Sequence, residues 1–152
     1  IRDRIQQILE AGRFAPSGMN KQLNHFYVIT DPNYLADLTA LVSRKMENYR
    51  DKDFRYGAPV LVLVTNQKES TTCVQDASCA MENMMLAAFS LGVGSCWINQ
   101  LRETCDVPEV RALLTEYGVP EDHIVVCSAA IGYIEKETPA KPRHEGLVSI
   151  TE

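Results

Sequence analysis

Residues 72–91, TCVQDASCAMENMMLAAFSL, constrain the fold more than any other stretch of the chain. They are rich in small residues and apolar nearly all round at helical spacing. We expect a central helix here, because such a surface must be covered on most sides. One small sheet cannot cover all of it, so the surplus is expected to be buried against a second copy of the chain. The β-like residues 147–150, LVSI, are a candidate strand that reaches across to that partner.

Strand-like and helix-like segments alternate around this helix, which predicts a layered α/β or α+β domain with a mixed β-sheet. Asp31 and Pro32 have the pattern of an N-cap followed by a proline in the first turn. The run PVLVLVT is typical of a strand buried on both faces. Helices are expected over residues 2–14, 32–46, 72–91 and 108–118, and strands over 25–30, 59–65, 94–99 and 123–134.

Length and charge limit the function classes. The chain has 152 residues, enough for one domain over residues 1–152 with a proper core. Its net charge of −5 argues against a nucleic-acid surface, and its longest strongly apolar run, APVLVLV, is far shorter than the ~20 residues of a membrane helix. The charged start IRDRIQQILE does not resemble a signal peptide. Because no initiator Met is present, we expect that some N-terminal residues are missing.

Five cysteines, at positions 73, 79, 96, 105 and 127, form neither a C-x-x-C pair nor an even set. This pattern indicates neither a disulfide framework nor a zinc site. We therefore expect free, mostly buried thiols, Cys96 among them, in a reducing compartment such as the cytoplasm. The three histidines are scattered, and no metal site is predicted.

Several common catalytic motifs are absent from the sequence. It has no P-loop and no G-x-S-x-G elbow. The run LGVGSC contains G-x-G, but it follows a helix and enters a strand, the reverse of the order in a dinucleotide fingerprint. We interpret it as a helix end, with Gly92 as the C-terminal glycine and Gly94 as a residue that lets the chain turn.

Three other segments together resemble the nitroreductase family of FMN-dependent oxidoreductases. They are APSGMNKQLNHFYVI, MENMMLAAFSLGVGSCWI and IGYIEKETPAKPR, in the order and spacing that the family shows. The resemblance covers most of residues 1–143. Two features depart from the family pattern: the usual R-R-S-x-R segment before the first helix is absent, and Leu23-Asn24 replaces the usual Pro-Trp.

The resemblance implies an α+β nitroreductase-like fold, with a mixed central sheet flanked by helices, in an intertwined homodimer with two FMN sites at the interface. It implies that NAD(P)H reduces FMN, which then reduces a nitroaromatic, a quinone or a similar acceptor in a second hydride transfer. No side chain need act as a base, so no catalytic residue is assigned. The loop of residues 16–22 is then expected to face a flavin, in many family members one bound mainly by the other subunit.

The chemistry of the matching residues suits a flavin. Hydroxyl and amide groups can hydrogen-bond its ring edge and ribityl chain, a glycine lets the backbone approach it, backbone N–H groups can reach its N5 region, and cations can bind its phosphate. The predicted FMN-binding residues are Pro16, Ser17, Gly18, Asn20 and Gln22 in the loop, Trp97, Ile98 and Asn99 after the central helix, and Lys141 and Arg143 near the C-terminus.

Each residue also has an ordinary interpretation. Ser17 and Asn20 are common turn residues, Trp97 is more often a core or interface residue, and Lys141 and Arg143 alone would usually be solvated charges. Two other functions therefore stay open: a non-catalytic α/β protein that binds a flavin or another nucleotide, and a domain without any cofactor.

Overall fold

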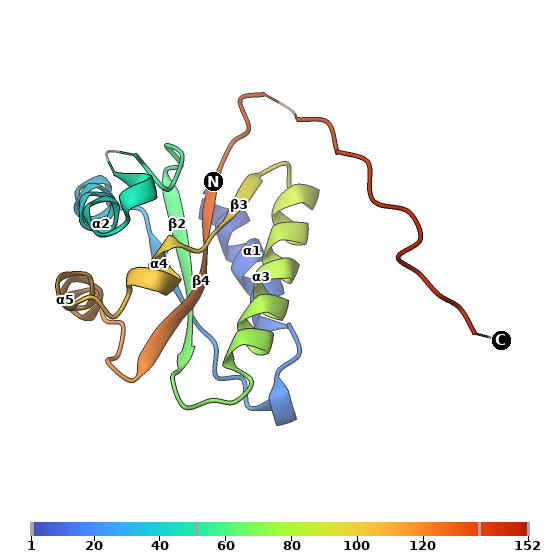
Figure 1. The fold of residues 1–152 in the computed structure, drawn as a ribbon, viewed down its shortest axis with the longest axis horizontal. Helices are drawn as coiled ribbons and strands as arrows, with labels where there is room; N and C mark the ends of the chain where they lie inside the picture. The colour runs from blue at the N-terminus through green and yellow to red at the C-terminus, as the bar shows by residue number, and fades with distance from the viewer. Residues whose placement is uncertain (1, 51, 137, 152) are drawn as a thin grey trace.

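The computed structural model describes residues 2–50, 52–136 and 138–151, which form a four-stranded sheet with helices on both faces (Figure 1). The helices are α1 (Arg2–Arg13), α2 (Pro32–Lys45), α3 (Cys73–Ser90), α4 (Gln100–Thr104) and α5 (Pro108–Glu116), with 3-10 turns η1 (Gly18–Asn20) and η2 (Glu47–Tyr49). The strands are β1 (His25–Ile29), β2 (Val60–Gln67), β3 (Gly94–Ile98) and β4 (His123–Gly132). All four predicted helices and all four predicted strands within the sheet are confirmed, whereas α4 and the two 3-10 turns were not predicted.

The sheet has the strand order β1-β2-β4-β3, and every strand pair in it is antiparallel. The prediction of a mixed sheet is therefore wrong for the described residues. Helix α3 carries the chain back along the sheet, so β2 and β3 run in the same direction, as a crossover requires. Strand β4 lies between them and pairs antiparallel with both, which removes the expected parallel pair.

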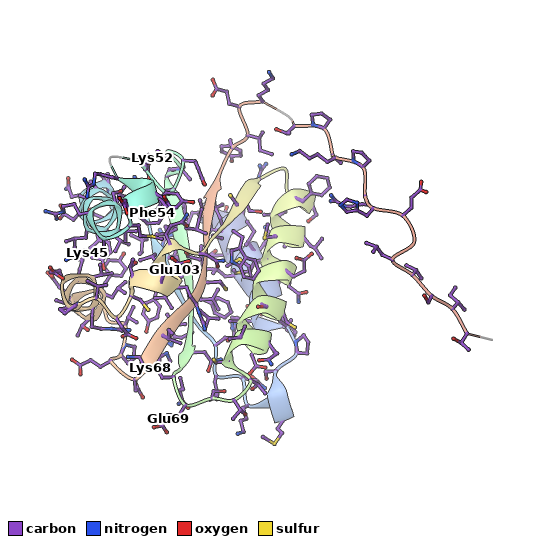
Figure 2. All side chains as sticks on the ribbon, viewed as in Figure 1. Lys45, Lys52, Phe54, Lys68, Glu69 and Glu103 are labelled. Carbon is purple, nitrogen blue, oxygen red and sulfur yellow. The ribbon has the colours of Figure 1, made fainter. Side chains whose placement is uncertain are left out.

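Two hydrophobic clusters, one on each face of the sheet, form the core. Strand β2 contributes to both, because alternate residues point to opposite faces. Leu61 and Leu63 pack with α2, α4 and α5, where Phe54, labelled in Figure 2, is fully buried. Val62 and Val64 pack with α1 and α3 on the other face. The prediction of a strand buried on both faces is confirmed.

Helix α2 begins as its sequence predicts. The Oδ1 atom of Asp31 accepts hydrogen bonds from the backbone N–H groups of Asn33 and Tyr34, each at 2.9 Å, and Pro32 occupies the first turn. The cap satisfies two of the donors that the first turn of a helix leaves free.

Helix α3 is covered on one side only. Ala77, Met81 and Met84 are buried against the sheet and α1, whereas Leu86 and Phe89 are 59% and 83% exposed. The expectation of a helix covered on most sides is thus wrong for the single chain. An apolar stripe is left on its outer side, which is the surplus surface that the sequence predicts. None of the described helices is long and apolar enough to cross a membrane.

The two glycines after α3 have different roles. Gly92 adopts a φ of 67° directly after the helix, which confirms it as the C-terminal glycine. Gly94, by contrast, lies within β3 and makes no turn. A Cβ atom there would lie 2.6 Å from the Ile134 side chain and 3.1 Å from the Gly132 carbonyl oxygen, so close packing is what requires a glycine.

The segment after β4 leaves the body of the molecule as an extended, exposed chain (Figure 1). The predicted strand 123–134 ends at Gly132, and Tyr133 and Ile134 are exposed. Residues 147–150 form no strand in the described chain. Their pairing with a partner chain stays a prediction.

All five cysteines are free, as predicted. Cys105 and Cys127 are buried, but Cys79 and Cys96 are exposed. The expectation of mostly buried thiols is therefore wrong, and Cys96 is not the buried thiol that the sequence led us to expect. It lies on β3, an edge strand, where one side of the chain has no neighbouring strand.

Candidate functional site

The loop of residues 16–22 begins where α1 ends, and its backbone is strained. Met19, Asn20 and Gln22 have φ values of 51°, 53° and 53°, in the left-handed region that only glycine enters freely. Such residues persist only where surrounding contacts hold them, and they are concentrated at functional sites. Pro16 and Met19 are exposed, so the loop faces outward from the chain.

The polar side chains of this loop bind one another but keep free groups. The Ser17 hydroxyl oxygen accepts the Gln22 N–H at 3.0 Å, and the Gln22 amide group donates to the Asn20 Oδ1 atom at 3.0 Å. These bonds leave the Ser17 hydroxyl proton, the Asn20 amide group and the Gln22 Oε1 atom for a ligand. The loop thus offers several donors and acceptors at fixed positions.

The missing side chain of Gly18 allows close packing inside the chain rather than close approach from solvent. Its N–H donates to Asp76 Oδ1 at 2.9 Å, and a Cβ atom at this position would lie 2.7 Å from Thr72 Oγ1. The absent side chain therefore permits close contact with Thr72. Asp76 and Thr72 were not predicted as site residues, although a carboxylate in an apolar helix was a signal that could have identified Asp76.

A small cavity of about 210 Å³ lies beside the loop. Its polar lining comes from Ser17, Gln22 and Asn24. Arg13 also lines it, and the Arg13 guanidinium group forms an ion pair with Glu10 at 2.7 Å. Gly12, Ala15 and Phe26 complete the lining. A planar polar edge of a ligand could be recognised here.

The second predicted segment, Trp97 to Asn99, lies at the edge of the sheet. Trp97 is 36% exposed, and its indole N–H donates to Asn99 Oδ1 at 2.7 Å. Ile98 is buried in the core, so only its backbone could meet a ligand. The next residue, Gln100, is buried, and its Oε1 atom has no hydrogen-bond partner among the described residues. This Oε1 atom is enclosed by protein and does not line the cavity beside the loop, so no ligand contact follows from it.

A larger cavity of about 490 Å³ lies at the opposite end of the sheet from the loop. Tyr56, Cys96 and Tyr133 are among its lining residues, together with Gly94 and Gly132, where β3 begins and β4 ends. Tyr56 has a φ of 57°, another strained position. This cavity was not predicted from the sequence, because its lining comes from three distant segments: two belong to the stretches that resemble the family, but residues 55–59 carry no such match.

The third predicted segment, with Lys141 and Arg143, is exposed and extends from that same end of the sheet (Figures 1 and 2). The loop lies at the other end, near the turn that Lys68 and Glu69 mark in Figure 2. Strand β4 has 10 residues and separates the two ends by roughly 30 Å, at about 3.3 Å per residue. The structure of one chain therefore does not bring the loop and the two cations together.

The buried thiols take no part in this arrangement. Burial raises the pKa of the Cys127 thiol to about 12, and its Sγ atom donates to the Ala77 carbonyl oxygen at 3.7 Å. Burial also raises the pKa of Cys105. Both stay protonated near neutral pH and are poor nucleophiles. Within the described residues, no three His, Cys, Asp or Glu side chains are grouped as metal ligands.

Comparisons with known proteins agree on one family. The sequence model described as "Nitroreductase family" matches residues 2–133 of this chain. A candidate NADH dehydrogenase/NAD(P)H nitroreductase of Archaeoglobus fulgidus is 32% identical over 143 residues, which cover 88% of this chain and 74% of that protein. A similarly named protein of Methanothermobacter thermautotrophicus is 28% identical over 138 residues, 85% of this chain and 64% of its own length.

Solved structures give the same result. A Bacteroides fragilis nitroreductase with bound FMN superimposes with a TM-score of 0.94 at 39% identity, covering 100% of this chain and 88% of its own. An iodotyrosine deiodinase bound to FMN and 3-iodo-L-tyrosine has a TM-score of 0.82 at 21% identity, covering 100% of this chain and 89% of its own. The second match supports only the fold.

Proposed function

Because the chain belongs to the nitroreductase family, we propose that it is an FMN-dependent NAD(P)H oxidoreductase that reduces nitroaromatic, quinone or similar acceptors. The observation that carries the proposal is the loop of residues 16–22. Its strained backbone presents the free polar groups of Ser17, Asn20 and Gln22 beside a polar cavity. The Bacteroides fragilis relative, which contains FMN, shares this fold.

The residues present fit FMN. The loop supplies hydroxyl and amide groups for the ring edge and ribityl chain. Lys141 and Arg143 are exposed cations suited to a phosphate dianion. When bound, FMN supplies the hydride-accepting and hydride-donating ring. The chain's own residues bind and orient it, and none is required to move a proton.

A homodimer would complete the site. In the conformation described, one chain holds the loop and the Lys141–Arg143 segment apart, because that segment leaves from the end of the sheet opposite the loop. Two antiparallel chains would place the loop of one beside the cations of the other. Each dimer would then have two FMN sites. The exposed apolar stripe of α3, which includes Leu86 and Phe89, supports this arrangement, because a partner chain would bury it away from water.

The proposal extends to the organisation of the chain and to its compartment. Residues 1–152 would act as one flavin-binding domain, since both hydrophobic clusters use the same sheet. Five free thiols fit the reducing cytoplasm.

The test is the absorption spectrum of the purified protein before and after NADH or NADPH is added without oxygen. We expect a yellow protein with a bound flavin, bleached by one of the two nucleotides and recoloured by a quinone or a nitroaromatic. A yellow protein that neither nucleotide bleaches would be a flavin-binding protein without this activity. A colourless protein that takes up no FMN would refute the proposal.

A further inference from the structure

Asp76 is a buried carboxylate without a cation. It lies in the first turn of α3 and is 3% exposed. Its Oδ1 atom accepts the Gly18 N–H at 2.9 Å, and its Oδ2 atom accepts the Thr72 hydroxyl at 3.0 Å. None of the ion pairs among the described residues includes it. The chain therefore uses this charge for hydrogen bonds rather than for an ion pair.

The position on α3 makes the buried charge tolerable. The free N–H groups and the dipole at the start of a helix favour a negative charge within the first turn. Hydrogen bonds to an ionised acceptor are also stronger than bonds between neutral groups. Asp76 can therefore hold Gly18 more firmly than an ordinary surface contact could.

The fit around Gly18 is specific. Because a Cβ atom there would lie 2.7 Å from Thr72 Oγ1, only glycine lets this backbone come close enough to reach Asp76. The hydrogen bonds that form the turn have their acceptors at Ser17 and Gly18. The Asn20 N–H donates to the Ser17 carbonyl oxygen, and the Lys21 N–H donates to the Gly18 carbonyl oxygen. The position of Gly18 therefore determines the position of the strained residues that come after it.

Asp76 also holds the far end of the loop. Its backbone carbonyl oxygen accepts a hydrogen bond from the Asn24 amide group at 2.9 Å, and Asn24 Oδ1 accepts one from the Asn66 amide group at 2.9 Å. One residue of α3 therefore fixes the chain on both sides of Met19, Asn20 and Gln22. These three residues have left-handed φ values that need such support.

We propose that Asp76, oriented by Thr72, is a positioning residue that preorganises the 16–22 loop for FMN. This inference rests on the proposed function, because it names the residue that readies the flavin-contacting loop. Asp76 touches no cofactor itself. It lowers the cost of binding, since a loop already held in its bound conformation loses less freedom when a ligand arrives.

The first measurement is FMN affinity, from flavin fluorescence with apo protein. Asp76→Ala removes the acceptor of the Gly18 N–H and should weaken FMN binding by roughly tenfold or more. Asp76→Asn should restore most of the affinity, because its amide oxygen can accept from Gly18 while its NH₂ group donates to the Thr72 hydroxyl oxygen. Should Asp76→Ala fail to fold, Thr72→Val serves instead, with an expected loss of a few-fold. Thr72 makes no side-chain cap bond, so α3 keeps its start in that variant.

The matched control is Asn83→Ala on the same helix. It removes a hydrogen bond from α3 to the Ala11 carbonyl oxygen, at 3.1 Å, without touching the 16–22 loop. It should lower the melting temperature yet leave FMN affinity within about twofold of wild type, because the loop keeps its anchor. If Asn83→Ala weakens FMN as much as Asp76→Ala does, or if folded Asp76→Ala binds FMN like wild type, the positioning role is wrong.

A second measurement needs no flavin. Lys21 is exposed within the loop and is a trypsin site. Asp76→Ala should be cut there faster than wild type and faster than Asn83→Ala, because its loop opens more often. Unchanged cleavage would overturn the anchoring of the loop. If wild type binds no FMN but this difference appears, the proposed function fails while the anchoring role survives.

Discussion

Arg143 offers the most direct single-residue test of phosphate binding. FMN has about two negative charges at its phosphate, which needs cations or backbone donors when it leaves water. Losing a charge-assisted hydrogen bond costs roughly 1.5–3 kcal/mol, and each 1.4 kcal/mol is a factor of about ten. Arg143→Ala should therefore weaken FMN about tenfold to a hundredfold in a fluorescence titration. The fold should be unaffected, because Arg143 is exposed.

Riboflavin and a second lysine serve as controls for this prediction. Riboflavin lacks the phosphate and should bind wild type and Arg143→Ala equally. Lys136→Ala removes an exposed positive charge from the same segment at a position that is not among the predicted FMN-binding residues, and it should leave FMN affinity within about twofold. Equal losses for FMN and riboflavin would show that Arg143 does not act on the phosphate.

The thiols should separate into two classes by burial. Cys96 is exposed and should react with a thiol reagent in the native protein, whereas Cys79, exposed in the single chain, lies on the same side of α3 as Leu86 and Phe89 and should react only where the chain is a monomer. Cys127, with a pKa raised to about 12, and buried Cys105 should react only after unfolding. The native rate of these two should stay low at pH 8, since their thiols are still protonated there. A denatured, unreduced sample should show all five free, and three or fewer would indicate disulfides.

Single residues were the hardest to predict from the sequence. The resemblance identified the loop, but it could not reveal that Gly18 approaches Thr72 or that Asp76 lies beneath the loop. Those contacts depend on tertiary packing, and the one between Gly18 and Asp76 joins positions 58 residues apart. Cys96 was misjudged for the same reason, because the sequence does not tell whether its strand lies at the centre or the edge of the sheet.

The apolar stripe of α3 should control the oligomeric state. Phe89 is 83% exposed and Leu86 is 59% exposed on one side of the helix. A charge placed there would have to be buried in a dimer, at a cost of several kcal/mol. We expect wild type to sediment as a dimer at micromolar concentration and Phe89→Glu to sediment as a monomer.

An exposed residue on the opposite face of the sheet provides the control. Thr115→Glu adds the same charge to α5 and should leave the dimer intact. A stable wild-type monomer, or equal dissociation of both variants, would mean that the α3 stripe is not an interface.

Elements were predictable where local chemistry decides them. The Asp31 cap, the burial of β2 on both faces and the φ of Gly92 each follow from a few neighbouring residues. Helix α4 has only 5 residues, too few to show a period. The sheet was wrongly predicted to be mixed, because the placement of β4 between β2 and β3 depends on the packing of the whole fold and not on local sequence.

The molecule as a whole separates two parts of its proposed site. The loop lies at one end of the sheet and the Lys141–Arg143 segment leaves from the other. If both parts bind one FMN, each site takes its loop from one chain and its cations from the partner. This arrangement predicts that two inactive variants can restore each other's activity.

The test combines Asn20→Gly with Arg143→Ala. Asn20→Gly removes the amide side chain but suits the left-handed φ of 53°, so the loop should keep its path. Each variant alone should bind FMN weakly at both sites of its dimer. After the two are unfolded and refolded together, half of the dimers should be mixed, and each mixed dimer has one site with both native parts. Tight binding should then return at about one site in four, counted by FMN titration. If both parts belonged to the same chain, mixing would restore no tight site, and the shared-site arrangement would be wrong.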